Sequence, residues 1–263
     1  MIFAAGLGTR LKPITDTLPK ALVPVCGKPL LEHVCRKLAD AGISEAVVNV
    51  HHFADKVEDW MAGQDRICAD QADYHSGDML IKVSDERSRL LETGGAVLHA
   101  RRYLEGCGSF LIHNVDILSN LDIRWFASQV RTDALATLLV SHRKSSRQLL
   151  FDPQTMRLVG WHNLQTGEIR SPYPDLELYE CVSMAFSGIH IMSDRIFDVL
   201  EEYAVAHGLR LTNEPPRFPI VDFYLWACAD HDIYGVCADG LELIDVGKLD
   251  SLEKAEQFIL NQA

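Results

Sequence analysis

Residues 1–30 read MIFAAGLGTRLKPITDTLPKALVPVCGKPL, and they give the starting point for interpreting the whole chain. A short apolar strand is predicted over Met1–Ala5, and it runs directly into the loop Gly6-Leu7-Gly8-Thr9-Arg10. Because glycine has no Cβ, backbone N–H groups in such a loop can approach a phosphate closely. Four basic residues and one acidic residue give this segment a local charge of +3, whereas the whole chain has a net charge of −12. A basic, glycine-lined loop in an acidic protein predicts a site for a polyphosphate.

The overall composition favours one large α/β domain, or one domain with a small appendage. The chain has 263 residues, 48% of them hydrophobic, and a mean hydropathy of zero, so it can bury a sizeable core. The charge of −12 argues against binding to nucleic acid or to an anionic membrane, because both need broad basic surfaces. The sequence contains no basic segment followed by an apolar stretch, and no apolar run near about eighteen residues. We therefore expect neither a secretion signal nor a membrane span.

The cysteines are scattered, odd in number and without a Cys-x-x-Cys pair. Most have apolar neighbours in the sequence, so buried free thiols are the simplest interpretation. Free thiols persist in a reducing compartment, and we therefore expect a cytoplasmic protein. The seven residues are Cys26, Cys35, Cys68, Cys107, Cys181, Cys228 and Cys237.

Strands and helices alternate in the first half of the chain. Apolar residues at helical spacing predict a helix that starts at Lys28-Pro29 and stops at Gly42. The continuous apolar run Glu45–Val50 is typical of a buried parallel strand. A helix over about residues 54–61 and a strand over Met79–Ser84 follow. This alternation indicates a doubly wound sheet with parallel strands.

Loops that carry glycine or carboxylate groups follow three of the predicted strands: Gly6–Arg10, Thr93–Gly95 and Asn114–Asp116. The loop Asn114–Asp116 comes directly after a predicted strand over Ser109–His113, and Thr93–Gly95 leads into a helix that runs to about Leu104. In open α/β sheets, ligands bind at the carboxyl ends of the strands. We therefore expect the three loops to converge on one ligand.

The second half begins with a long predicted strand, Ala134–His142, after which the pattern changes. Glycine and proline turns between short apolar segments in residues 143–183 indicate short antiparallel strands rather than another βα unit. The later predicted elements are strands over Val182–Met192, Ile233–Ala238 and Leu243–Val246, and helices over residues 194–206, over Pro219–Ala229 and from Asp250 or Ser251 onward. With no internal repeat and no low-complexity linker, the sequence predicts one domain over residues 1–263.

The glycine loop differs from the two best-known phosphate-binding motifs. A dinucleotide-binding fingerprint needs Gly-x-Gly-x-x-Gly, but Leu11 stands where the third glycine belongs. A P-loop needs Gly-x-x-x-x-Gly-Lys followed by Ser or Thr, which the sequence lacks. The chain instead has Gly6–Arg10 followed by Pro13, and then the frame Pro19-Lys20-Ala21-Leu22-Val23-Pro24. This pattern resembles the sugar-1-phosphate nucleotidyltransferases, the superfamily of mannose-1-phosphate guanylyltransferase and of glucose-1-phosphate thymidylyl- and uridylyltransferases.

The resemblance extends over the whole chain, because further segments occur in the family's order: Glu92–Ala96, Asn114–Asp116, Phe186–Gly188 and Ile244–Gly247. Among short members, the chain looks most similar to mannose-1-phosphate guanylyltransferase-like and N-acetylmuramate-1-phosphate uridylyltransferase-like proteins. The resemblance implies an α/β fold, Rossmann-like with three α/β/α layers, a mostly parallel central sheet and a small antiparallel excursion on the sugar side. Residues 1–133 would then form mainly the nucleotide-binding half, and residues 134–263 mainly the sugar-phosphate-binding half.

The resemblance also implies a reaction, the Mg²⁺-dependent transfer of a nucleotidyl group from a nucleoside triphosphate to a sugar 1-phosphate, with release of pyrophosphate. Arg10 would hold the β- and γ-phosphates, and Lys20 would stabilise the charge that builds at the α-phosphate. Asp116 and Asp245 would bind Mg²⁺, a hard ion that prefers oxygen ligands. The implied nucleotide-binding residues are Ala5, Gly6, Leu7, Gly8, Thr9, Glu92, Thr93, Gly94, Gly95 and Asn114, and the implied sugar-binding residues are Ser187 and Gly188.

Neither the base nor the sugar is chosen by the sequence. The base is expected against the backbone of Glu92–Gly95, and GTP, UTP and dTTP all remain open. Many relatives carry Glu-Lys-Pro after the strand that begins the sugar half, and its lysine touches the sugar phosphate. Here the comparable place reads Val-Gly-Trp-His-Asn over residues 159–163, so a second phosphate-binding cation is unassigned. The candidates are Arg143, Lys144, Arg147 and His162.

Each of these assignments has a structural alternative. Lys20 could be a surface lysine, and Asp116 could cap a helix. Asp245 could be a turn residue, and the pair Gly94-Gly95 could simply start a helix. His51 and His52 are more readily interpreted as hydrogen-bonding groups at a strand end than as catalysts, because this chemistry needs no general base.

Two other functional classes were compared with an active nucleotidyltransferase. A non-catalytic regulatory relative that binds a nucleotide-sugar should lack the phosphate- and metal-binding residues. All four of these residues are present here: Arg10, Lys20, Asp116 and Asp245. A metal-dependent glycosyltransferase would usually carry Asp-x-Asp, but the comparable triplet is Asn114-Val115-Asp116. That class would also release a nucleoside diphosphate and no pyrophosphate.

Overall fold

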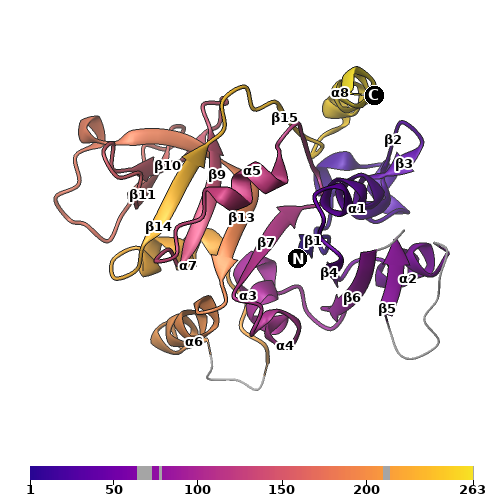
Figure 1. Cartoon of the computed structure of the whole chain (residues 1–263), viewed down its shortest axis with the longest axis horizontal. Helices are drawn as coiled ribbons and strands as arrows, with labels where there is room; N and C mark the ends of the chain where they lie inside the picture. Colours follow the sequence, from indigo (N-terminus) through magenta and orange to yellow (C-terminus); the bar gives the residue numbers. More distant parts are fainter. Residues whose placement is uncertain (64–72, 77–78, 210–213, 263) are drawn as a thin grey trace. The chain divides into compact units, whose positions relative to one another are not determined.

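The computed structural model describes residues 1–63, 73–76, 79–209 and 214–262. Its residues form two compact units, which alternate along the chain. Unit 1 comprises Met1–Leu90, His113–Ile123 and Glu242–Ala263, and unit 2 comprises Leu91–Ile112 and Arg124–Leu241. Figure 1 shows the elements of both units coloured along the sequence. That the whole chain acts as one domain stays a prediction.

Unit 1 is built on a parallel sheet. Strand β1 (Ile2–Phe3) lies between β4 (Glu45–Val50) and the last two residues of β7 (Ser109–Asn114), and β6 (Met79–Asp85) pairs with β4; all these pairs are parallel. The predicted strand Glu45–Val50 is confirmed, and its residues from Ala46 onward are buried, as expected of a central strand. Strand β5 (Asp73–Ser76) pairs antiparallel with β6 at the edge.

The sheet register fixes where the ligand loops of unit 1 begin. Phe3, the last residue of β1, pairs with Asn114, the last residue of β7. Because neighbouring parallel strands end at the same edge, the chain after Phe3 and the chain after Asn114 leave the sheet side by side. The backbone N–H of Val115 donates to the carbonyl of Phe3 at 3.1 Å, which continues the pairing beyond the strands.

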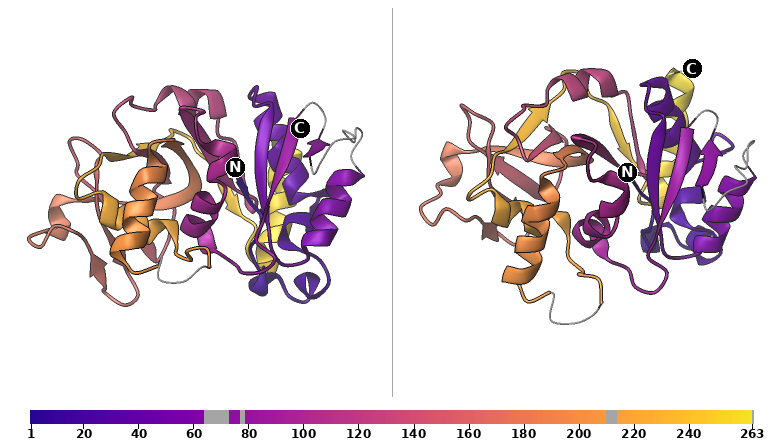
Figure 2. Two further views of the ribbon diagram at one scale, coloured as in Figure 1. Left: turned by 90° about the horizontal axis from the view of Figure 1, so that it is seen from below. Right: turned by 60° about the horizontal axis from the view of Figure 1, so that its bottom comes forward.

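Helices α1 (Leu30–Asp40), α2 (Ala54–Ala62) and α8 (Leu252–Gln262) belong to unit 1. The predicted apolar stripe of α1 is confirmed by its buried residues Leu30, Leu31, Val34, Cys35 and Leu38. The helix begins at Leu30 rather than at Lys28, because β3 (Lys28–Pro29) pairs with β2 (Pro24–Val25) in a small hairpin. Helix α8, yellow in Figures 1 and 2, lies beside the indigo N-terminal elements, and the thiol of Cys26 donates to the carbonyl of Glu256.

Unit 2 contains mainly antiparallel pairs. The long strand β13 (Val182–Ser193) pairs antiparallel with β10 (Arg147–Phe151) over its first residues and with β9 (Ala136–Ser141) over its later ones. Strand β11 (Leu158–Asn163) joins β10 to β12 (Ile169–Arg170), and β14 (Ile233–Cys237) pairs parallel with β9. The predicted antiparallel strands after residue 142 are therefore confirmed.

The remaining elements are short connections and helices. Helices α3 (Glu92–His99), α4 (Arg101–Leu104), α6 (Ile196–Ala206) and α7 (Ile220–Ala227) belong to unit 2, and α5 (Ile123–Ser128), which the sequence did not predict, joins the units along the chain. A separate two-stranded antiparallel sheet in unit 1 pairs β8 (Ile117–Ser119) with β15 (Leu243–Asp245), which are far apart in the sequence. Single 3-10 turns are η1 (Thr9–Leu11), η2 (Ile14–Asp16), η3 (Lys20–Leu22), η4 (Leu178–Glu180) and η5 (Leu249–Ser251). Within the described part of the chain, every helix is too short or too polar to cross a lipid bilayer.

The cysteines only partly follow the prediction of buried thiols. Six of them are described, and all six are free thiols. Cys35 and Cys228 are buried, and burial raises the pKa of each thiol to about 12. Cys26 and Cys107 are exposed, so the prediction is wrong for these two, and Cys68 lies outside the described residues.

Candidate active site

A hydrogen bond from the Thr15 side chain helps to hold the glycine loop of unit 1 in place. The carbonyl of Gly8 accepts hydrogen bonds from the backbone N–H of Leu11 and from the hydroxyl of Thr15, both at 2.8 Å. Gly8 has a φ of 63°, and a Cβ on it would lie 2.8 Å from the Thr15 methyl carbon. Glycine is therefore required here by the fold, and Thr15, which the sequence analysis did not single out, positions the loop.

Gly6 differs from Gly8 in a way that matters for function. Its φ lies outside the left-handed region, and no atom of the described residues lies within 4 Å of the place where its Cβ would stand. The fold alone therefore does not require glycine at this position. Gly6, Leu7 and Thr9 are exposed, so this side of the loop is open to a ligand.

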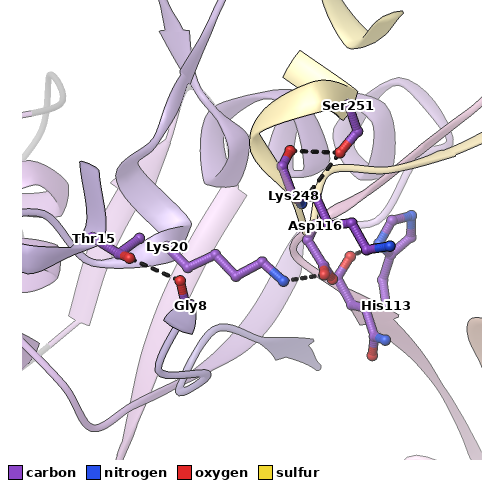
Figure 3. A network of polar contacts seen from close by, with 8 residues as sticks. Gly8, Thr15, Lys20, His113, Asp116, Lys248 and Ser251 are labelled. Atoms are coloured by element: carbon purple, nitrogen blue, oxygen red, sulfur yellow. Dashed lines mark hydrogen bonds and ion pairs between the residues drawn. The ribbon is translucent and has the colours of Figure 1, made fainter. Parts of the chain in front are cut away.

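Lys20 and Asp116 form an ion pair in unit 1 (Figure 3). Lys20 begins η3, and Asp116 lies in the turn after β7. Their side chains are only 12% and 15% exposed, so their attraction is screened less than that of a surface pair. The two residues that the sequence assigned to phosphate and to metal therefore contact each other directly.

The antiparallel pair β8–β15 brings the backbone of Asp245 next to that of Asp116. Asp245 pairs in register with Ile117, and the backbone N–H of Val246 donates to the carbonyl of Asp116 at 2.8 Å. The hydroxyl of Ser251 accepts from the backbone N–H of Lys248, which fixes the chain just after β15 (Figure 3). This bond belongs to the turn η5 (Leu249–Ser251), and the expected capping of the final helix by Asp250 or Ser251 stays a prediction.

Arg10 reaches the same place from the glycine loop. A terminal nitrogen of its guanidinium and a carboxylate oxygen of Asp245 each lie 2.6 Å from the point where a Cβ of Gly247 would stand. The two groups are therefore within twice that distance of each other, and a Cβ at Gly247 would require the ends of both side chains to shift. Arg10, Lys20, Asp116 and Asp245 are called the charged cluster below.

A buried network supports the end of β1. The side-chain oxygen of Asn49 accepts from the backbone N–H of Ala4 at 2.7 Å, and its amide nitrogen donates to the carboxylate of Glu86 at 2.8 Å. Nδ1 of His51 hydrogen-bonds to the carbonyl of Glu86 at 2.7 Å, which confirms the prediction of a hydrogen-bonding histidine at the strand end. Glu86 was not identified from the sequence, because no local pattern distinguishes it from other acidic residues.

His113 lies fully buried in β7, next to Asn114. Its Nδ1 hydrogen-bonds to the carbonyl of Asn114 at 2.8 Å, and its Nε2 has no partner within the described part of the chain. Burial lowers the pKa of His113 to about 4, so the ring is neutral at pH 7. Asn114, predicted to bind nucleotide, is half-buried at the end of the same strand.

The oxygen donors of the charged cluster fit a magnesium ion. Mg²⁺ is usually held by one or two carboxylates, together with water and substrate phosphates. Asp116 and Asp245 supply two carboxylates from adjacent backbone segments, and no group of three or more His, Cys, Asp or Glu side chains suited to a metal occurs within the described ranges. This donor set suits an ion that shares its ligands with a bound phosphate.

In unit 2, the segment Glu92–Gly95 is tied to the chain near Phe218. The N–H groups of Gly94 and Gly95 donate to the carbonyl of Phe218 at 2.9 and 3.2 Å. A Cβ on Gly94 would lie 2.3 Å from the Phe218 ring, and one on Gly95 would lie 2.2 Å from the carbonyl oxygen of Pro216. Packing within the unit explains both glycines, and a base contact by this segment must use groups other than these two N–H groups.

Glu92 and Thr93 also bond to the chain on either side of Phe218. Glu92 pairs with Arg217 at 2.8 Å, and the Thr93 hydroxyl accepts from the backbone N–H of Ile220 at 2.8 Å. The predicted role of this segment in nucleotide binding stays a prediction.

The predicted sugar-binding residues lie at an irregularity of β13. The register between β13 and β9 shifts between Phe186 and His190, and Gly188 has a φ of 73°. Ser187 is completely buried, and its hydroxyl has no partner among the described residues. The side chain of Ser187 does not reach the surface in this conformation, and the role of Ser187 and Gly188 in sugar binding stays a prediction.

The structure brings together only part of the predicted site. Within unit 1 it gathers the charged cluster, the glycine loop and Asn114, and it thereby confirms that two of the three predicted loops lie side by side. The third loop, Thr93–Gly95, belongs to unit 2, as do Ser187 and Gly188. That these residues face the same ligand stays a prediction.

Comparison with known proteins shows that the chain is similar to nucleotidyltransferases. The family described as nucleotidyl transferase matches residues 1–148. The N-acetylmuramate alpha-1-phosphate uridylyltransferase of Caulobacter vibrioides is 32% identical over 248 residues, which cover 92% of this chain and 88% of that protein. The protein of the same name from Neisseria meningitidis serogroup B is 33% identical over 211 residues, covering 78% of this chain and 80% of that protein.

The fold is also found among solved structures. That of HddC from Yersinia pseudotuberculosis, complexed with GMP-PN, matches with a TM-score of 0.69 at 20% identity, covering 98% of this chain and 97% of that one. This likeness confirms the predicted α/β, Rossmann-like nucleotidyltransferase fold. Because the family matches more than half of the chain and a relative matches nearly all of it, the protein is an enzyme of the nucleotidyl transferase family and belongs to its sugar-1-phosphate nucleotidyltransferases.

Proposed function

We propose that the enzyme transfers a uridylyl group from UTP to N-acetylmuramate α-1-phosphate and releases pyrophosphate. The observation that carries the reaction is the charged cluster beside an exposed glycine loop, all within unit 1. The choice of substrates is supported by the two relatives above, which share this activity in their names and together span most of the chain. The sequence alone left GTP, UTP and dTTP open.

The bond changes follow from the substrates. A phosphate oxygen of the sugar 1-phosphate attacks the α-phosphorus of the triphosphate, and the bond from that phosphorus to the β-phosphate oxygen breaks, so pyrophosphate leaves. The nucleophile is already an anion, and no covalent intermediate with the enzyme is needed. The protein must mainly bring polyanions together and stabilise the charge that develops.

The charged cluster and the loop suit this task. Arg10 would hold the β- and γ-phosphates together with the N–H groups of residues 6–9, and Lys20 would move from Asp116 to the α-phosphate. Asp116 and Asp245 would hold Mg²⁺, which supplies positive charge to the phosphate oxygens when it is bound. The hydrogen bond between Thr15 and Gly8 keeps the loop in place before the substrate arrives.

Two expectations from the sequence remain part of this proposal. The first is the use of Mg²⁺ as the metal, for which the two carboxylates are the support. The second is a location in the cytoplasm, for which the free thiols are the support.

A substrate panel tests the proposal. The purified enzyme would be given UTP, dTTP or GTP with N-acetylmuramate, N-acetylglucosamine, glucose or mannose 1-phosphate, and pyrophosphate release would be measured with Mg²⁺ present. We expect the highest kcat/KM for UTP with N-acetylmuramate 1-phosphate. A higher value for another pair would overturn the substrate assignment. Binding without pyrophosphate release would favour the regulatory alternative, and release of a nucleoside diphosphate alone would favour a glycosyltransferase.

A further inference from the structure

Arg143 in unit 2 has no carboxylate partner among the residues that the structure describes. Its guanidinium donates from a terminal nitrogen to the carbonyl of Phe186 at 2.8 Å, and no acidic group of the described residues lies within ion-pair distance. Three other arginines of the same unit have such partners at 2.7 to 2.8 Å: Arg157 with Asp232, Arg170 with Asp222 and Arg217 with Glu92. Arg195 of the same unit likewise bonds to backbone carbonyls rather than to a carboxylate, so the missing ion pair alone does not set Arg143 apart.

The unpaired charge of Arg143 is partly buried. Its Nε is completely shielded from solvent and has no hydrogen-bond partner within the described part of the chain. Guanidinium groups carry five N–H donors in a planar fork that matches carboxylate and phosphate oxygens. A buried donor without a partner is unfavourable. The Nε–H of Arg143 is therefore suited to donate a hydrogen bond to an anionic ligand.

Two further unpaired donors lie in the same part of the fold. The hydroxyl groups of Ser141 and Ser187 are buried, and both are without a partner in the described ranges. Ser141 is the last residue of β9 and pairs in register with Ala185 of β13, and Phe186 pairs with Val140. The end of β9 and the irregular part of β13 therefore concentrate polar groups that the protein itself leaves unsatisfied.

Phe186, whose carbonyl orients Arg143, is fixed by neighbouring aromatic residues. Its ring packs against His190 with a centroid distance of 5.2 Å, and Nδ1 of His190 hydrogen-bonds to the Tyr224 hydroxyl at 2.6 Å. Burial lowers the pKa of His190 to about 3, so the ring is neutral and adds no positive charge beside Arg143.

We propose that Arg143 binds an anionic oxygen group of the sugar substrate, and this inference rests on the proposed function. Arg143 would then do the work for which the chain lacks the lysine of Glu-Lys-Pro. N-Acetylmuramate 1-phosphate offers two such groups, the 1-phosphate and the carboxylate of its lactyl ether. The carboxylate is planar and the phosphate is tetrahedral, and both offer oxygen acceptors to the N–H donors of the guanidinium. Substrates that lack one of the two groups distinguish them.

The test compares Arg143→Gln and Arg143→Lys with the wild-type enzyme and with Arg102→Gln. Arg102 is an exposed arginine of the same unit that bonds to the Tyr103 hydroxyl, so its removal changes the charge by the same amount. The KM for the sugar and the KM for UTP would be measured with N-acetylmuramate 1-phosphate and with N-acetylglucosamine 1-phosphate, which has no lactyl carboxylate. Thermal unfolding would be measured for each variant, and Arg143→Lys preserves the charge if Arg143→Gln fails to fold.

Arg143→Gln should raise the KM for the sugar about 10- to 100-fold, the usual effect of losing a charge-assisted hydrogen bond, while the KM for UTP stays within about twofold. Arg143→Lys should recover part of the loss, and Arg102→Gln should resemble wild type. An equal rise with both sugars supports contact with the phosphate, and a rise confined to N-acetylmuramate supports contact with the carboxylate.

An unchanged sugar KM in both Arg143 variants, or an equal rise in the KM for UTP, would overturn the assignment. Calorimetric titration of N-acetylmuramate 1-phosphate into wild type and Arg143→Gln separates this failure from that of the proposed function. If the wild type releases no pyrophosphate with any pair, the proposed function fails, whereas the titration still reports whether Arg143 binds the sugar phosphate. Equal affinity of the two proteins in that titration overturns the inference on its own.

Discussion

Lys20 and Asp116, which are 96 positions apart in the chain, form an ion pair whose side chains are 12% and 15% exposed. In the absence of ligand each neutralises the other, and this avoids leaving either charge partly buried and alone. Binding of a triphosphate with its metal would offer each residue a new partner of opposite charge. The pair therefore gives each side chain an oppositely charged partner until the proposed ligands bind.

Replacing Lys20 with Ala should lower kcat at least about 100-fold, because one cationic donor to the transition state is lost. Lys20→Arg should retain more activity than Lys20→Ala. The matched control is Lys12→Ala, since Lys12 belongs to the same segment and pairs on the surface with Asp16 at 2.9 Å. Steady-state pyrophosphate release measures all three variants. If Lys20→Ala turned over within a few-fold of wild type, the role given to Lys20 would be wrong.

Removing the metal with EDTA should abolish activity, and Asp245→Asn should raise the Mg²⁺ concentration for half-maximal activity about tenfold or more, because even the loss of groups that support metal ligands has effects of this size. Asp250→Asn is the control, since it removes an exposed carboxylate of the neighbouring turn η5. The measurement is the initial rate as a function of Mg²⁺ concentration. Equal Mg²⁺ dependence of wild type and Asp245→Asn would exclude Asp245 as a ligand.

The two loop glycines should respond differently to alanine. Gly6→Ala should leave the free energy of unfolding within about 0.5 kcal/mol, because the added methyl meets open space, but it should raise the KM for the triphosphate about tenfold. Gly8→Ala should lower the free energy of unfolding by about 1–3 kcal/mol, because φ is 63° and the methyl meets Thr15 at 2.8 Å. Urea denaturation and substrate kinetics on the two variants check this, and a normal KM for Gly6→Ala would show that phosphate does not approach this position.

Acidification should destabilise the protein through its buried histidines. Burial lowers the pKa of His190 to about 3 and that of His113 to about 4, whereas an unfolded histidine titrates near about 6.5. Above that value both states are neutral and pH has no effect through these groups. Below it the unfolded state binds protons that the folded state does not, so the free energy of unfolding falls by about 1.4 kcal/mol per pH unit for each histidine until about pH 4.

Urea denaturation at pH 7, 6 and 5 measures this dependence. The variant His190→Gln should show a shallower decrease than wild type, by about one proton's contribution, because Gln at position 190 does not titrate. Equal slopes for the two proteins would contradict the assignment of a neutral, buried His190.

Several elements could be predicted because their signals are local. The continuous apolar run of β4 and the helical stripe of α1 are patterns within single segments, and both were confirmed. The frame around Lys20 and the aspartate after β7 could be recognised in the same way. Their mutual contact could not, because it depends on the parallel register that aligns Phe3 with Asn114.

Other features depend on tertiary packing that no short pattern encodes. The glycines at 94 and 95 resembled a ligand loop, but the ring of Phe218 and the carbonyl of Pro216 explain them. The burial of Ser187 follows from the register shift in β13, which a sequence of alternating residues does not reveal. Thr15 hydrogen-bonds to Gly8, and Glu86 hydrogen-bonds to Asn49. In the sequence, neither residue differs from other polar residues.

The three segments of unit 1 have a consequence for biosynthesis. Lys20 and Asp116 are both translated before most of unit 2, but Asp245 and the strand β15 that contains it come only after all of unit 2. A ribosome-bound chain can therefore form the Lys20–Asp116 pair long before it has the second carboxylate. We expect metal affinity to develop late in translation. The nascent chain would then neither bind the metal nor catalyse the reaction until its folding is nearly complete.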